Sequence, residues 1–159
     1  MSYVIKPIPL VEVTVDKSAL TYLMNYGTPL TLGIYAWLID GGDVKILVDT
    51  GCSAEVESSA GFPAKQICDI HRGLRRRGVL PSDIDMVIFT HLHFDHCVYS
   101  KEFVNAKFIV QERELNAALN PHPAEKLFYD RSFIDGLEFE TINGDKEIID
   151  GIEVVLTPG

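Results

Sequence analysis

The sequence predicts an α/β fold in which strands dominate and helices lie between them. Short apolar or alternating runs of strand length recur along the chain, for example at 34–39 and 86–89. By contrast, the segment 64–77 carries apolar residues at helical spacing, which gives one apolar face. Asp-Gly and Gly-Gly pairs separate several of the runs and indicate tight turns.

The first half of the predicted fold is rich in strands. Weak alternation predicts a strand at 3–15, and the irregular stretch at 19–32 predicts a loop. A strand at 34–39 then leads through a hairpin turn at 40–43 into a partner strand at 44–48.

Helices and further strands alternate in the rest of the chain. The helix at 64–77 ends on three arginines, which the dipole of a helix C-terminus favours, and Gly78 then caps it. A second helix at 112–119 is stopped by Asn120 and Pro121. The remaining strands are expected at 86–89, 107–110, 146–149 and 152–156, the last two joined as a hairpin by the turn at 150–151.

Composition fits one globular domain over residues 1–159. A chain of 159 residues that is 47% hydrophobic can build one core. Its net charge of −9 argues against nucleic acid as a partner, because phosphate binding needs a basic face.

The cysteines and the N-terminus predict a cytoplasmic protein. Three cysteines, an odd number, without an export signal favour reduced thiols. Residues 1–7 form no continuous apolar region, and no window is long and apolar enough to predict a membrane partner. Cys97 follows a histidine, but it is interpreted as a small buried residue rather than as a ligand.

Three histidines and one aspartate lie within six consecutive positions: His91, His93, Asp95 and His96. Imidazole nitrogens and carboxylate oxygens are donors that zinc and similar divalent metals prefer. The run directly follows the apolar strand at 86–89, and a loop at a strand end is where a rigid scaffold presents functional side chains. The chain has only five histidines, so this concentration favours a metal site over a solvated loop.

The spacing of these residues suggests two pairs of ligands. In an extended segment, residues two apart point to the same side, so His91 and His93 can bind one metal. If the chain then turns into a helix, Asp95 and His96 can bind a second metal. Two-metal hydrolytic sites hold their ions about 3.5–4 Å apart.

With these motifs the sequence resembles the metallo-β-lactamase superfamily. The segment 90–96 is similar to the metal-binding signature of that superfamily, and 45–51 resembles its strand ending in Asp-Thr-Gly. The segment 80–88 resembles the approach to the metal loop, and 156–159 resembles the stretch that leads into another metal-binding histidine. These motifs occur in the order of the family, which makes the resemblance specific.

Two features point to a branch of the superfamily. Phe94 and the segment 108–114 resemble most the N-acyl-homoserine lactonases and related hydrolases of small esters and lactones.

The resemblance implies a four-layer αββα sandwich, of which residues 1–159 form the N-terminal portion of an incomplete domain. Further metal ligands are expected beyond Gly159, including a third histidine, so the C-terminal part of the domain is expected to be absent. The implied cofactors are two divalent metal ions. Zinc is the expected metal, and iron and manganese are alternatives, because His and Asp sites select weakly by affinity.

The implied reaction opens a lactone or cleaves a small ester with a hydroxide that bridges the two metals. Asp95, a ligand of the second metal, would also move a proton to the leaving alkoxide. Asp49 would orient a metal-bound imidazole by accepting its other N–H, although a turn-forming role is an alternative. Phe94 and Phe62 would line the substrate pocket, with packing in the core as the alternative for Phe94.

Other functions stay open at this point. A hydroxyacylglutathione-type thioesterase, an iron-dependent sulfur dioxygenase and an inactive fragment with a partial metal site are the alternatives. Self-association, for example into a homodimer, is also an alternative, because an uncovered sheet edge favours pairing.

Overall fold

The computed structural model describes residues 2–21, 24–41 and 43–158. Parts of two predicted segments lie outside the described residues: Tyr22 and Leu23 of the loop at 19–32, and Gly42 of the turn at 40–43. Gly159, beyond which further ligands are expected, also lies outside them.

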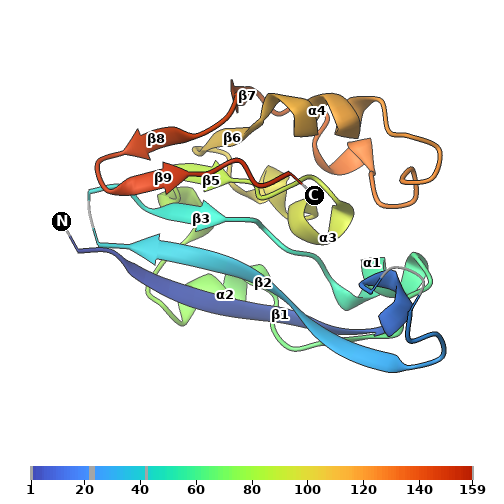
Figure 1. The fold of residues 1–159 in the computed structure, drawn as a ribbon. Coiled ribbons are helices and arrows are strands. Elements are labelled where there is room, and N and C mark those ends of the chain that lie inside the picture. The colour runs from blue at the N-terminus through green and yellow to red at the C-terminus, as the bar shows by residue number, and fades with distance from the viewer. Residues whose placement is uncertain (1, 22–23, 42, 159) are drawn as a thin grey trace.

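A mixed seven-stranded sheet organises these residues (Figure 1). The strand order is β4-β1-β2-β3-β5-β6-β7, and β8 and β9 form a separate two-stranded sheet. The strands span Val4–Asp16 (β1), Pro29–Asp40 (β2), Ile46–Val48 (β3), Ala64–Gln66 (β4), Met86–Ile88 (β5), Lys107–Gln111 (β6), Phe139–Ile142 (β7), Lys146–Ile149 (β8) and Ile152–Val154 (β9).

Strand direction divides the sheet into two parts. β1 and β2 form a long antiparallel pair with an irregularity between Pro9 and Val11, and β2 pairs antiparallel with β3. From β3 onward the neighbours β5, β6 and β7 are parallel. The carboxyl ends of these parallel strands therefore meet at one edge of the sheet, where open α/β sheets bind ligands.

Within the described ranges, four short α-helices connect the strands: Ala54–Ser59 (α1), Ile70–Arg75 (α2), Phe94–Cys97 (α3) and Glu112–Leu119 (α4). The side chains of Ser53 and Asp69 cap the first turns of α1 and α2 by accepting backbone N–H groups. Single 3₁₀ turns lie at Lys17–Ala19, Pro81–Asp83, Ser100–Glu102 and Arg131–Phe133.

The two faces of the large sheet are covered differently. One face packs against helices, and its core includes Ile8 and Val87 of the sheet with Leu74 of α2 and Ala118 of α4. The other face packs against the β8–β9 hairpin around Ile46, Ile88, Ile109 and their neighbours. The described residues thus form three layers in the order helices, large sheet, small sheet (Figure 1).

Most predicted elements are confirmed, several of them with shifted ends, and the strand β7 was not predicted. The helix at 112–119 is confirmed at both ends, and the strands at 86–89 and 107–110 are confirmed to within one residue. The predicted helix at 64–77 is wrong in its first half, where 64–66 pairs with β1 as strand β4. The predicted loop at 19–32 ends earlier than expected, because β2 already begins at Pro29.

Several other properties follow from the described residues. Cys52, Cys68 and Cys97 are all buried free thiols, in agreement with the interpretation of Cys97. Within residues 2–21, 24–41 and 43–158, no helix combines the length and the apolar character that crossing a membrane requires.

Gly51 is a point where backbone and packing together require glycine. Its φ is +70°, and a Cβ there would overlap the side chain of Leu10. Gly78 has a nearly identical φ of +71° with nothing within 4 Å of a Cβ, so it supplies a matched comparison.

We expect Gly51→Ala to lower the free energy of unfolding by about 2–4 kcal/mol, through both backbone strain and overpacking. Gly78→Ala should lower it by only about 1 kcal/mol, since only the strain applies. Urea unfolding followed by circular dichroism measures both values, and equal losses in the two variants would contradict the packing of Gly51 on Leu10.

Candidate metal centre

The candidate site lies at the carboxyl ends of β3 and β5, which are parallel neighbours. Val48 at the end of β3 pairs with Ile88 at the end of β5, and the Asp49 N–H donates to the Ile88 carbonyl at 2.9 Å. Thr90 follows β5 within two residues, so Asp49 and Thr90 leave the sheet side by side. The sheet thereby brings the Asp-Thr-Gly segment against the histidine-rich loop.

Three of the four predicted ligands form one cluster. Donor atoms of His91, Asp95 and His96 all lie within 4.8 Å of one another. The rings of His91 and His96 have their centroids 3.9 Å apart, and Nε2 of His96 lies 3.2 Å from Oδ2 of Asp95. The loop 91–93 followed by the turn of α3 produces this closeness, because the helix returns its first residues toward His91.

His93 lies beside the cluster and is not part of it. Its ring centroid is 4.6 Å from that of His91, in an edge-on arrangement. The rings of His91 and His96 lie closer to each other than those of His91 and His93, and which of the four residues share a metal stays a prediction. The N-cap position of His93 on α3 directs this ring toward Phe128 and Tyr129 instead.

Asp49 is the buried carboxylate that joins the two strand ends. It is 3% exposed, and its φ of +56° is unusual for a residue other than glycine. Its Oδ1 accepts the Thr90 N–H at 2.8 Å, while its Oδ2 lies 2.8 Å from Nδ1 of His96. The predicted proximity of Asp49 to an imidazole is therefore present, although its effect on a bound metal stays a prediction.

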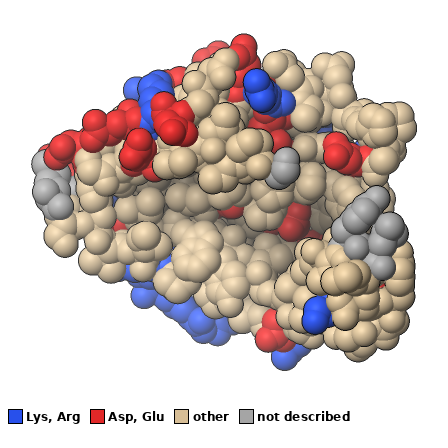
Figure 2. Space-filling model, in the orientation of Figure 1, with Lys and Arg blue, Asp and Glu red and all other residues tan. Residues whose placement is uncertain are grey.

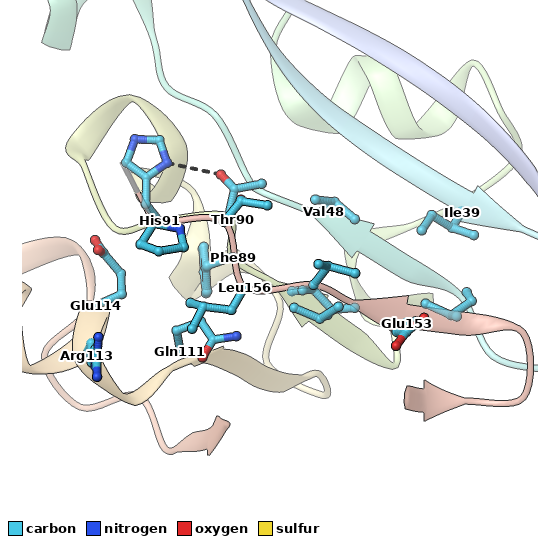
Figure 3. Close-up of a pocket in the computed structure, with 16 residues that line it drawn as sticks. Ile39, Val48, Phe89, Thr90, His91, Gln111, Arg113, Glu114, Glu153 and Leu156 are labelled. Carbon is cyan, nitrogen blue, oxygen red and sulfur yellow. Dashed lines mark hydrogen bonds between the residues drawn. The ribbon is translucent and has the colours of Figure 1, made fainter. Parts of the chain in front are cut away.

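The Thr90 side chain adds a contact that the sequence motif alone did not identify. Its hydroxyl donates to Oδ2 of Asp49 at 2.7 Å and lies 3.1 Å from Nδ1 of His91. Figure 3 draws the contact between Thr90 and His91. A hydroxyl directly before the first histidine was visible in the sequence, but its partners depend on the sheet.

Hydrogen bonds from residues later in the chain also hold the loop that carries the histidines. Oε1 of Glu114, on α4, accepts the Leu92 N–H at 2.8 Å and the Tyr129 hydroxyl at 3.1 Å. The Phe94 N–H donates to the carbonyl of Phe128 at 2.8 Å. Glu114 lies 22 positions after Leu92, and Phe128 lies 34 positions after Phe94. Because these partners are distant in sequence, no local sequence pattern identifies them.

The pKa values of the three histidines in this loop are shifted in different directions. Burial is the largest cause that lowers the pKa of His91, to about 4, and it also lowers the pKa of His93. For His96, burial disfavours the charged ring, but hydrogen bonds to Asp49 and Asp95 outweigh it and raise the pKa to about 10. His96 is therefore the ring that carries a proton on both nitrogens when no metal competes for Nε2.

The pKa values of two carboxyl groups in this region are shifted in opposite directions. Burial disfavours ionised Asp95, but its hydrogen bond to His96 and the nearby imidazoles outweigh this and lower the pKa of Asp95. Glu57 is 3% exposed, and burial raises its pKa while the Cys52 thiol donates to its Oε1 at 3.3 Å.

Of the four candidate ligands, His91 alone is among the described residues that line a cavity of about 660 Å³. Ile39, Val48 and Ile88 of the large sheet line it on one side, and Leu156 lies on the other. It opens in the hollow between the β8–β9 hairpin and the β1–β2 part of the sheet (Figure 2). Figure 3 shows Thr90 and His91 at one end of this cavity.

The two aromatic side chains predicted to contact substrate lie elsewhere. Phe94 is 5% exposed, and Phe62 is partly buried against the core on the helix-covered side of the sheet. Among the described residues that line the 660 Å³ cavity, neither is present. A role of Phe94 or Phe62 in substrate binding stays a prediction.

The donor set fits a divalent metal. Two imidazoles and one carboxylate converge, as zinc and similar cations require, and one of the imidazoles has a carboxylate on its other nitrogen. Partly buried ligands supported by buried partners form a prearranged site rather than a solvated loop. The motif at residues 91–96 thus has the geometry of a metal site.

Comparison with known proteins gives consistent matches. The family model described as the metallo-beta-lactamase superfamily matches residues 30–159. An N-acyl homoserine lactonase of Bacillus thuringiensis is 31% identical over 164 residues, covering 96% of this chain and 64% of the relative. The N-acyl homoserine lactonase AiiB of Agrobacterium fabrum is 28% identical over 128 residues, covering 68% of this chain and 46% of the relative.

Solved structures agree with these relatives. A mutant of B. thuringiensis AiiA with N-decanoyl-L-homoserine bound at the active site superposes with a TM-score of 0.83 at 28% identity, covering 98% of this chain and 65% of that one. An N-acyl homoserine lactone hydrolase with the product N-hexanoyl-L-homoserine at its catalytic metal centre gives a TM-score of 0.80 at 27% identity, with 99% and 65% coverage. The chain spans 64% of the length of the first relative named above.

The raised pKa of His96 predicts a dependence of stability on pH in the metal-free protein. The ring gains its second proton near pH 6.5 when unfolded and near pH 10 when folded. Its contribution to stability is therefore fully present below about pH 6.5 and is lost as pH rises toward about 10. We expect Asp49→Asn to flatten this loss, because it removes one of the two carboxylates at the ring.

The measurement is urea unfolding of chelator-treated protein between pH 6 and pH 10. Glu102→Gln is the matched control, since it removes a carboxylate 3.6 Å from the half-exposed His71. An unchanged pH dependence in Asp49→Asn would refute the ion pair between Asp49 and His96.

Proposed function

Because the chain belongs to the metallo-β-lactamase superfamily, we propose that the protein is a metal-dependent hydrolase that opens lactones or cleaves small esters. The observation that carries this proposal is the convergence of His91, Asp95 and His96 within 4.8 Å at the edge of the sheet. The match to N-acyl homoserine lactonases over nearly the whole chain supports the choice of substrate.

The proposed metal ligands are His91, His93, Asp95 and His96, in a dinuclear centre. Zinc is the proposed metal, with iron or manganese as alternatives, since nitrogen and oxygen donors suit all three. When bound, two such cations supply an activated water near neutral pH and polarise the carbonyl of the substrate. His91 and His93 would bind one metal, and Asp95 and His96 the second. The 4.6 Å between the ring centroids of the first pair and the 3.2 Å between Oδ2 and Nε2 of the second support this division.

Asp95 is the proposed proton carrier of the reaction. A carboxylate is ionised near neutral pH, so Asp95 can accept a proton as the nucleophile attacks. It can then deliver that proton to the alkoxide that leaves the opened ring. Its position beside His96, with 3.2 Å between Oδ2 and Nε2, supports this role at the proposed metal centre.

Asp49 is proposed to hold the imidazole of His96 in the orientation that binding needs. It accepts the Nδ1–H of His96 at 2.8 Å, which leaves Nε2 directed toward Asp95. Carboxylates in this position typically contribute about 10–100-fold to metal affinity.

The proposed substrates are N-acyl-homoserine lactones, as the relatives' names indicate. Phe94, which precedes Asp95, and Phe62 remain the proposed contacts for the apolar part of such a substrate. The net charge of −9 supports a small molecule rather than nucleic acid as partner. The cytoplasmic location and the homodimer stay predictions.

The test measures lactone opening by the protein in the full length that its gene encodes, purified with zinc. N-hexanoyl- and N-decanoyl-homoserine lactone are supplied, and proton release is followed with a pH indicator. Chelation should abolish the activity and zinc should restore it. Asp95→Asn should lower kcat/KM by at least about a thousandfold, because it removes a ligand and the proton carrier together.

Asp135→Asn is the matched control, since Asp135 is half-exposed and, within the part of the chain that the structure describes, pairs with Arg131 alone on the surface. It should leave kcat/KM unchanged. Turnover of glutathione thioesters or persulfides, without lactone opening above the buffer rate, would contradict the proposal and favour the thioesterase or the dioxygenase alternative.

A further inference from the structure

We propose that Thr90 is a positioning residue: its hydroxyl sets which nitrogen of His91 carries the proton and thereby leaves Nε2 free for a metal. The inference rests on the proposed metal centre, and it concerns a side chain that is not itself a ligand. It follows from the contacts that join Thr90 to Asp49 and His91. Two hydrogen bonds meet at Oδ2 of Asp49, from the Thr90 hydroxyl and from Nδ1 of His96, and the Thr90 hydroxyl in turn lies beside Nδ1 of His91.

The first step is the direction of the Thr90 hydroxyl. An ionised carboxylate accepts hydrogen bonds and donates none, so the hydroxyl, 2.7 Å from Oδ2 of Asp49, must donate its only hydrogen there. The Thr90 N–H donates to Oδ1 of the same carboxylate at 2.8 Å, which holds the two groups in register. Oγ1 of Thr90 is then left with acceptor capacity alone.

The second step is the ring of His91. Its Nδ1 lies 3.1 Å from Oγ1 of Thr90. Since that oxygen can only accept, Nδ1 must carry the hydrogen, and the neutral ring then has its lone pair on Nε2. The proton position of His91 therefore follows from a hydroxyl on the preceding residue.

The third step is the same constraint on His96. Its Nδ1 lies 2.8 Å from Oδ2 of Asp49 and 3.4 Å from Oγ1 of Thr90, so its hydrogen goes to the carboxylate. Nε2 of His96 then faces Asp95 at 3.2 Å. One carboxylate thus orients His96 directly and His91 through Thr90, and both rings direct Nε2 away from Asp49.

This arrangement requires the hydroxyl of Thr90 and not its methyl group. Serine at position 90 should preserve the hydrogen bonds, whereas valine keeps the shape and removes them. Removal would leave Nδ1 of His91 without its acceptor, so the ring could protonate either nitrogen.

The test compares Thr90→Val and Thr90→Ser in the full chain, labelled with ¹⁵N. Long-range ¹H–¹⁵N spectra of the metal-free protein at pH 8 distinguish the two tautomers of each imidazole. We expect His91 to carry its hydrogen on Nδ1 in the unaltered protein and in Thr90→Ser, and to lose this preference in Thr90→Val.

Zinc affinity, measured by competition with a chromogenic chelator, is the second readout. Thr90→Val should weaken it about 10–100-fold, and Thr90→Ser by no more than about threefold. Thr31→Val is the matched control, because among the described residues the Thr31 hydroxyl bonds to that of Thr14 alone, at 3.4 Å on the β1–β2 hairpin. It should change neither readout.

An Nε2–H tautomer of His91 in the unaltered protein would overturn the proposal, and this result does not depend on whether Thr90→Val folds. An unchanged tautomer and zinc affinity in folded Thr90→Val would also overturn it. The spectra report the tautomer without metal or lactone, so they test the role of Thr90 separately from the proposed function. A protein that binds no zinc would contradict the proposed function, whereas the spectra would still decide the role of Thr90.

Discussion

The carboxylate of Asp49 is the constraint on which the candidate site depends. It is buried at the end of β3, in a left-handed backbone conformation, and it accepts hydrogen bonds from the backbone and hydroxyl of Thr90 and from His96. A buried charge is tolerated only when it is paired and hydrogen-bonded, so these partners and the carboxylate fix one another. The parallel pairing of β3 with β5 brings the partners together, and the donor atoms of His91, Asp95 and His96 converge at the same sheet edge.

Local patterns in the sequence predicted the parts of the fold that depend on local rules. Asn120 and Pro121 follow the helix at 112–119, and the strands β5 and β6 contain apolar runs that are buried in the sheet. The four candidate ligands were identified because they are neighbours in sequence. The helix predicted at 64–77 begins too early. Ile70 and Leu74 do lie on a buried helical face, but Ile67 is 39% exposed and 64–66 pairs with β1 as a strand.

The parts that sequence patterns did not predict depend on contacts between distant residues. Asp49 and His96 are 47 positions apart, and the support of Leu92 by Glu114 joins a loop to a helix 22 positions away. The strand β7 was not expected, because its alternation is brief and its place is defined only by pairing with β6. Likewise, the cluster of His91 with His96 rather than with His93 follows from the turn of α3.

Anomalous diffraction from crystals grown with zinc tests the metal centre most directly. The geometry predicts a zinc peak at the cluster, with Nε2 of His91, a carboxylate oxygen of Asp95 and Nε2 of His96 each within about 2.0–2.2 Å of a metal position. Coordination by Nδ1 of His91 or His96 would contradict the orientation that Thr90 and Asp49 impose. A crystal saturated with zinc at other residues and lacking a peak at this cluster would contradict the metal centre itself.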